Sequence, residues 1–284
     1  MTPTSITPHI LHEARPQFDW KGSGSLSLKT FRNGRCLYEA GRGHFAVDES
    51  NYLLLNEGQE YSLHIDSPVP VESFCIFFPP GFVEDIHRSL QGSDLYLLDE
   101  PYKSSPLGAI EWIERTYPIG NQLGASLGHF RHLVNQDAVD SWGNDELVHQ
   151  LAVHMLGVHR DVKLEIDELG YVKRSTSEEI YRRVYLGHEY MSAYFYQPIT
   201  LAETASIAHL SVNHFLRNYK KLFHTSPHRY LTELRLQVAK QILLDTVKSV
   251  TDICYGVGFE SLGSFSTLFT RRFHVSPSNL RAKR

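Results

Sequence analysis

The sequence predicts an α+β protein of two domains, in which a β-barrel with helices after it is followed by an all-helical domain. The length of 284 residues suits two domains of ordinary size. Residues 26–78 consist of short apolar segments separated by turn residues, whereas only helical periodicity appears from residue 178 onward. Charge is divided as well: residues 173–284 carry sixteen Lys and Arg against eight Asp and Glu, a net charge of +8, while residues 1–172 carry −12.

The composition excludes several classes of protein. A hydrophobic fraction of 42% with 21% charged residues is typical of a globular chain, and no apolar run is long enough to span a membrane. The three cysteines, Cys36, Cys75 and Cys254, are scattered and form neither a disulfide framework nor a zinc finger. The first twenty residues lack an export signal. We therefore expect a cytoplasmic protein with no membrane segment.

The acidic half begins with strands. Apolar segments at roughly ten-residue spacing, separated by turn residues that include Ser67-Pro68, predict a β-sandwich or barrel. Helical spacing of apolar residues follows, and residues from about 160 to 177 are polar and irregular enough to join the halves. The predicted strands are Arg35–Tyr38, Tyr52–Leu55, Tyr61–Ile65 and Val71–Phe78, and the predicted helices are Phe82–Leu90, Asn121–Val134 and Glu146–Val158.

An apolar stripe on the last two of these helices has two interpretations. Such a stripe is typical of the seam of a homodimer, and equally of helices that pack on the chain's own barrel. The sequence leaves both interpretations open. The stripe consists of Leu123, Leu127, Phe130, Leu133, Leu147, Leu151 and Met155.

The basic half contains an internal repeat. Residues 215–227 (FLRNYKKLFHTSP) align with residues 265–277 (FSTLFTRRFHVSP) at an offset of 50, with five identities in thirteen positions. Two copies of one supersecondary unit are therefore expected. The identical pairs are Phe215/Phe265, Phe223/Phe273, His224/His274, Ser226/Ser276 and Pro227/Pro277.

Each copy has the pattern of a helix, a short turn and a second helix. Capping boxes start the first helices at Thr200 and Ser249, and Ser211 and Ser261 can cap the second helices. The second helices bury aromatic residues and expose polar and basic ones on the opposite face. This is the helix-turn-helix pattern, whose second helix enters the DNA major groove. A helical domain with a merely solvated basic face is the weaker alternative, because it does not explain the repeat.

A long helix separates the two copies. Ser226-Pro227 is typical of a helix start, and the periodicity continues to about Leu244, giving a length of about 27 Å. One turn of B-DNA is about 34 Å, so this rod could set two reading helices in successive major grooves.

Residues 178–281 resemble the AraC/XylS family of bacterial transcription regulators. The resemblance rests on Ile253–Phe259 (ICYGVGF), Ser264-Phe265 and Phe273–Pro277, and on Leu210-Ser211 with Arg217 in the first copy. It implies double-stranded DNA as the partner, bound in the major groove over two adjacent turns, and usually activation, with RNA polymerase as a further partner. The barrel resembles, more diffusely, the cupin-like sensor half of such regulators. The predicted domains are a cupin-like ligand-sensing or dimerisation domain at 1–165, a linker at 166–177 and the double helix-turn-helix domain at 178–284.

The resemblance assigns DNA-contacting roles by position. Arg217 suits guanine and Asn213 suits adenine, whereas the second reading helix has only small groove-facing side chains and would mainly position the protein. His224 and His274 stand where the family often has Gly, and we interpret them as variant helix caps. The predicted base-facing residues are Asn213, Leu216, Arg217, Gly263, Ser264 and Thr267. Ser211 and Lys220 are expected to meet phosphate and Thr270 and Arg271 to lie near the DNA backbone, and the capping residue Ser261 is a further DNA-binding candidate.

The predicted barrel contains no recognisable catalytic or cofactor-binding motif. No nucleophile elbow, phosphate-binding loop or dinucleotide motif is present, so we expect no enzyme activity and no cofactor. The histidines lack the spacing of a metal site, so none is predicted. Candidate ligand-binding residues are Tyr38, His44, Tyr52, Tyr61 and His64.

The predicted function is a sequence-specific, DNA-binding transcription regulator, expected to be an activator, that a small-molecule effector in the barrel controls. The alternative is a regulator of the same type without a small ligand, whose first half serves only dimerisation or protein contacts.

Overall fold

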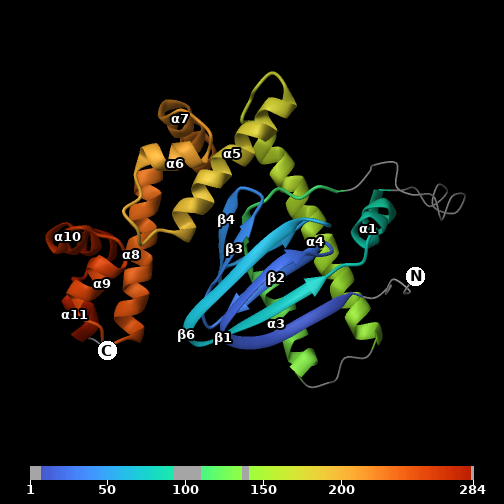
Figure 1. Ribbon diagram of the computed structural model, residues 1–284, viewed down its shortest axis with the longest axis horizontal. Coiled ribbons are helices and arrows are strands. Elements are labelled where there is room, and N and C mark those ends of the chain that lie inside the picture. Colours follow the sequence, from blue (N-terminus) through green and yellow to red (C-terminus); the bar gives the residue numbers. More distant parts are fainter. Residues whose placement is uncertain (1–7, 92–109, 136–140, 283–284) are drawn as a thin grey trace, which may run out of the picture. The chain divides into compact units, whose positions relative to one another are not determined.

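The computed structural model describes residues 8–91, 110–135 and 141–282. The chain divides into two compact units, Met1–Gly170 and Tyr171–Arg284, which are coloured from blue to yellow-green and from yellow to red in Figure 1. No helix in these described ranges is long and apolar enough to cross a membrane.

The strands of the first unit form a nearly closed antiparallel barrel, as predicted (Figure 1). Within the described residues the sheet has seven strands in the order β4-β3-β6-β2-β5-β7, with β1 lying along β6. The strands are β1 (His9–Ser23), β2 (Ser27–Arg32), β3 (Cys36–Ala40), β4 (Gly43–Val47), β5 (Asn51–Leu55), β6 (Glu60–Phe77) and β7 (Thr116–Pro118).

Strand β6 organises the barrel, and it corrects one prediction. Ser67-Pro68 is not a turn between two strands, because β6 is a single strand of 18 residues. Its first part pairs with β3 and its last part with β2, while β1 follows it along both. The prolines lie where the β1 ladder is irregular, between the pairs Arg15↔Val71 and Gln17↔Asp66. Proline has no backbone N–H to donate, and at an irregular point of the ladder this absence removes little stability from the sheet.

Strand β1 is absent from the sequence prediction, which began the barrel near Leu26. Alternate residues of β1, among them Glu13 and Arg15, face into the barrel beside Phe18 and Trp20. Charged residues on the inward face remove the apolar alternation that identifies a half-buried strand.

Two helices cover the outer face of the barrel, α3 (Asn121–Asn135) and α4 (Ser141–Glu168), with α1 (Phe82–Gln91) beside α4. Phe130 of α3 meets Phe74 of β6 with ring centroids 5.7 Å apart. Most of the predicted apolar stripe is buried within the chain, and Leu133 and Leu147 are half-buried. The interpretation that the stripe packs on the chain's own barrel is therefore confirmed. The stripe residues no more than 2% exposed are Leu123, Leu127, Phe130, Leu151 and Met155.

The predicted irregular join is helical over much of its length. Helix α4 continues through Glu168 because Val162 and Ile166 extend its buried stripe. The next helix begins at Arg174, so only residues 169–173 between them lie outside helices. The boundary between the compact units, at Gly170 and Tyr171, falls within the predicted 166–177 linker.

The second unit contains the repeat. Helices α6 and α7 form one helix-turn-helix, α9 and α10 form the other, and α8 connects them (Figure 1). Helix α5 precedes the first copy and α11 follows the second. The helices are α5 (Arg174–Ala193), α6 (Leu201–Ile207), α7 (Val212–Phe223), α8 (Pro227–Asp245), α9 (Val250–Gly256), α10 (Leu262–Phe273) and α11 (Pro277–Ala282).

The predicted helix starts are confirmed. Thr200 forms a full capping box with Glu203. The other N-cap serines each accept a backbone N–H from three residues further on: Ser211, Ser226, Ser249 and Ser261. The predicted capping box at Ser249 is incomplete, because the Asp252 carboxylate accepts from the Ser249 hydroxyl at 2.6 Å and not from the Ser249 backbone N–H. Because these bonds are local, the sequence suffices to identify them.

The repeated histidines end the second helix of each copy. His224 and His274 have left-handed backbone conformations, with φ of 52° and 58°. Their N–H groups donate to the carbonyls of Lys220 and Thr270. Their interpretation as variant helix caps in place of Gly is confirmed.

Candidate nucleic-acid interface and barrel cavity

Helix α7 separates a buried face from an exposed polar face. Phe215 and Tyr219 are completely buried in the helical unit. On the opposite side, Asn213, Arg217 and Lys220 are exposed, with Leu216 half-exposed. All four are residues that the sequence assigned to DNA.

Helix α10 repeats this division with smaller side chains. Phe265 and Phe269 are completely buried. Gly263, Ser264 and Thr267 are exposed, and none of these three positions carries an Arg, Lys, Asn or Gln, the residues that make bidentate contacts to bases.

Three hydroxyl groups among the residues assigned to DNA already make hydrogen bonds within the protein, as acceptors or as donors. The Oγ atoms of Ser211 and Ser261 accept the N–H groups of His214 and Ser264 at 3.4 Å each. A hydroxyl that accepts such a bond still has its own hydrogen to donate to a phosphate oxygen. Thr270 differs, because its hydroxyl donates to Ser266 O at 2.8 Å.

The Arg and Lys side chains on the exposed faces of α7 and α10 differ in their ion pairs. Arg272 donates to Glu233 of α8 with N···O distances of 2.7 and 2.9 Å. Neighbouring Arg271, and Arg217 and Lys220 on α7, have no ion pair with any residue that the structure describes. The positive charges of these three side chains are therefore not paired by a carboxylate of the described residues.

A buried polar cluster behind α7 was not predicted. Asn218 is 2% exposed and accepts a hydrogen bond of 2.9 Å from the Tyr171 hydroxyl. That hydroxyl also lies 3.1 Å from Nε2 of His214. Partial burial lowers the pKa of His214, with Arg217 and Arg183 as lesser causes. Asn218 follows Arg217 directly on α7, so the cluster fixes the helix that presents Arg217.

The interior of the barrel contains a cavity of about 340 Å³, within the range of small-molecule sites, about 300–1,000 Å³. Its wall is largely aromatic, and Lys29, Arg15 and Glu13 are its charged residues. The lining comprises Leu11, Glu13, Arg15, Phe18, Trp20, Ser23, Gly24, Lys29, Phe31, Tyr38, Tyr61, Leu63, Ser73, Cys75 and Phe77.

Lys29 is the unexpected residue of this cavity. It is 2% exposed, and its Nζ lies 3.8 Å from the centroid of the Phe77 ring. Burial lowers the pKa of Lys29, because desolvation opposes the charged form. The sequence did contain a signal for this position. Residues two apart on a β-strand lie on the same face, so Lys29 shares the inward face of Phe31.

The candidate ligand-binding residues divide into two groups. Tyr38 and Tyr61 line the cavity, and burial raises the pKa of Tyr61 to about 12, so its hydroxyl is neutral. Tyr52 instead stacks on Tyr117 with centroids 5.4 Å apart. His44 lies 3.5 Å from Glu39, and His64 lies 2.6 Å from Asp19 on the outside of the barrel. The structure therefore does not bring these last three residues to the cavity.

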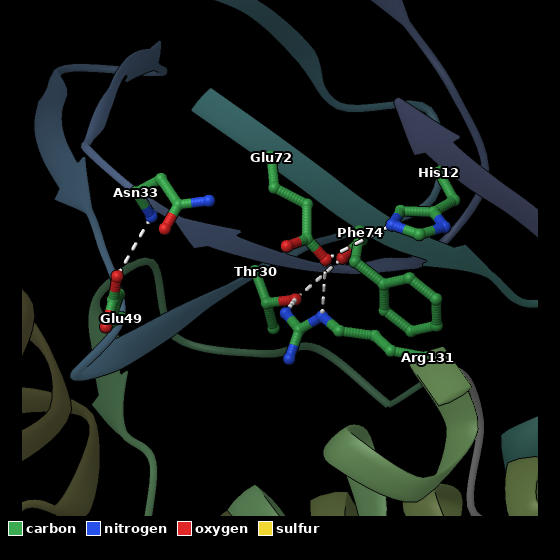
Figure 2. Close-up of polar contacts among 7 residues, drawn as sticks. All are labelled: His12, Thr30, Asn33, Glu49, Glu72, Phe74 and Arg131. Atoms are coloured by element: carbon green, nitrogen blue, oxygen red, sulfur yellow. Dashed lines mark hydrogen bonds and ion pairs between the residues drawn. The ribbon is translucent and has the colours of Figure 1, made fainter. Parts of the chain in front are cut away.

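Directly behind the cavity wall lies a polar network (Figure 2). Arg131 of α3 is 5% exposed, and its Nη2 donates to Thr30 Oγ1 at 2.6 Å. Its Nε lies 3.2 Å from Glu72 Oε1, which also lies 3.1 Å from His12 Nε2. The strand neighbours of these residues line the cavity, Lys29 beside Thr30 and Ser73 beside Glu72, so the network joins α3 to the cavity wall.

Metal ligation has no candidate in the ranges that the structure describes. No group of three or more His, Cys, Asp or Glu side chains there is placed to hold an ion.

Comparison with protein families gives two matches, one in each unit. Residues 4–134 match the AraC-like ligand binding domain. Residues 204–283 match a helix-turn-helix domain.

Two curated relatives match different shares of the chain. An uncharacterised HTH-type transcriptional regulator of Bacillus subtilis, YobQ, is 24% identical over 233 residues, 81% of each chain. The HTH-type transcriptional activator RhaS of an Enterobacter species is 37% identical over 95 residues, 34% of each chain. Both are named as transcriptional regulators and neither as an enzyme. Among solved structures, an AraC-type regulator from Chromobacterium violaceum is 30% identical, covering 36% of this chain and 90% of its own, with a TM-score of 0.34.

Proposed function

Because this chain belongs to the AraC family of DNA-binding transcription regulators, we propose that it activates transcription under the control of a small molecule bound inside its barrel. The observation that carries the effector part is the cavity of about 340 Å³. An apolar cavity with a few charged groups is what a small-ligand site requires. Helix packing alone would need no such space in the barrel.

We propose that the two reading helices divide the work of DNA recognition. Arg217 and Asn213 on α7 read base edges, while α10 mainly positions the protein through Arg271 and its small polar residues. Helix α8 has 19 residues, which corresponds to about 28 Å against about 34 Å for one turn of B-DNA. This length supports binding of both helices to adjacent turns of the major groove.

Substituting the two free cations of α7 should have different consequences. Arg217→Ala is expected to cost about 1–3 kcal/mol and to relax specificity at one base pair, because a bidentate contact is lost. Lys220→Ala is expected to weaken binding to all DNA sequences alike, because a phosphate contact is lost. The slope of log affinity against log salt concentration should become smaller by about one. Selection of bound DNA from a random pool, followed by salt titrations of the selected site, measures both effects.

Arg272→Ala is the matched control, since that arginine is held by Glu233. It should leave base preference unchanged. If Arg217→Ala also left the preference unchanged, the assignment of Arg217 to base reading would be wrong.

Effector control is tested on the full chain. A metabolite panel is screened for compounds that raise the melting temperature, and each hit is then added to a DNA-binding titration and to a promoter-reporter assay. We expect a compound that stabilises the protein also to change operator affinity or reporter output. Stabilising compounds that change neither would contradict effector control.

The alternative function, a regulator whose first half makes only protein contacts, is disfavoured by the open cavity. A homodimer stays a prediction, and it would have to use residues other than the covered stripe of α3 and α4. As an activator the protein would also need RNA polymerase as a partner. A bacterial regulator acts on the chromosome, so we also propose that this protein acts in the cytoplasm.

A further inference from the structure

We propose that the barrel cavity binds a compact monocarboxylate with an apolar body, and that Lys29 holds its carboxylate. This inference rests on the proposed effector function and names the ligand's chemical class.

The first step is the isolation of the Lys29 charge. A lysine with 2% exposure is rare unless it is paired, because burying an unpaired ammonium is costly. In the part of the chain that the structure describes, no carboxylate forms an ion pair with Lys29. Its near neighbours are the rings of Phe77 and Tyr61, at 3.8 and 5.4 Å from Nζ to the centroids. Ring faces only partly replace the lost hydration.

The second step is the charge balance of the lining. Glu13 is the one carboxylate among the lining residues, and it is already bound by Arg15, with N···O distances of 2.9 and 2.7 Å. That pair is neutral as a unit, so one positive charge, that of Lys29, remains uncompensated. A ligand with a single negative charge would neutralise it, whereas a dianion would leave an excess charge in an apolar space.

The third step concerns the rest of the ligand. Trp20, Phe31 and Tyr38 line the cavity with aromatic surface, which favours a hydrocarbon or aryl body. Sugars would require many polar partners, whereas Glu13 and Arg15 are bound to each other and the remaining polar lining is Lys29, two serines and two tyrosines. The wall therefore fits an aliphatic or aryl monocarboxylate.

The experiment compares acids with their neutral amides on the full chain. Octanoate and 3-phenylpropionate are titrated by calorimetry against octanamide and 3-phenylpropionamide, which match them in shape. We expect each acid to bind about 10- to 100-fold more tightly than its amide, the range of a charge-assisted hydrogen bond. Trp20 fluorescence should change on binding, and the change should be lost in Trp20→Phe.

Lys29→Met tests the residue itself. Methionine keeps much of the side chain's volume without the charge, so this variant should melt at or above the temperature of the wild type. Its affinity for the acids should fall to that of the amides. Lys21→Met, on the exposed side of β1, is the matched control and should bind the acids as the wild type does.

Three results would overturn the proposal: amides that bind as tightly as the acids, Lys29→Met that keeps the acid affinity, or no binding of either acid at millimolar concentration. The effector function is judged separately. It survives if neutral compounds enter the cavity and alter DNA binding. It fails, while the carboxylate assignment stands, if the acids bind through Lys29 and the DNA affinity does not respond.

Discussion

Replacing Arg131 by methionine is expected to lower the free energy of unfolding of the N-terminal unit by about 3 kcal/mol, because a buried ion pair loses one partner. Arg131 is 5% exposed and lies in contact with both Thr30 and Glu72 (Figure 2). Without the guanidinium, His12 is the one partner that Glu72 keeps among the described residues, and Thr30 loses its donor. Thermal or urea unfolding of the full chain, followed by probes in each unit, measures the loss.

A surface arginine supplies the control for this prediction. Arg160 on α4 has a side chain that is 77% exposed and lies 3.5 Å from Asp161, so Arg160→Met should change stability by no more than about 0.5 kcal/mol. A loss at Arg131 as small as that at Arg160 would show that the network adds little to stability. The double variant Arg131→Met with Glu72→Gln should then isolate the pair, since the two changes share one interaction.

Phe215→Ala is expected to cost about 3–5 kcal/mol in the helical unit, because it removes a large, completely buried ring. Phe215 is 0% exposed, and helix α5 approaches it so closely that a Cβ on Gly187 would lie 2.7 Å from its ring. The rigid backbones around the site cannot collapse fully into the space. Specific DNA binding should be lost together with stability, since α7 would no longer be held in place.

Leu216→Ala, at the next position of the same helix, is the matched control. Leu216 is half-exposed on the face assigned to DNA, so its truncation should affect DNA affinity while changing the unfolding free energy by less than about 1 kcal/mol. Equal losses of stability at the two positions would contradict the division of α7 into a buried face and a reading face.

The helix starts and the repeat were predictable because they depend on neighbours in the chain. A serine that caps a helix accepts an N–H three residues further on, as Ser261 does from Ser264, so identity and spacing contain the information. The aromatic spacing of Phe265 and Phe269 likewise places one face inward without reference to any distant residue.

Strand β1 and the cavity were not predictable in this way. Leu11 lines the cavity and His12 faces the network behind it, and neither assignment follows from a local pattern that mixes charged and apolar residues. Of the five candidate ligand residues, only Tyr38 and Tyr61 reach the cavity. The aromatic character of a residue says nothing about which side of a closed sheet it faces, because the strand register decides that.

The sequence by itself determined the two helix-turn-helix copies, their caps, the exposed faces of α7 and α10, and the confinement of positive charge to the half that carries them. These properties arise from local hydrogen bonds and from periodicity along single helices. Only the tertiary structure decided that the stripe of α3 and α4 is covered by the barrel, and that no carboxylate of the described residues pairs with the buried Lys29. Both depend on contacts between residues far apart in the chain: Lys29 meets Phe77 only because β2 and β6 pair.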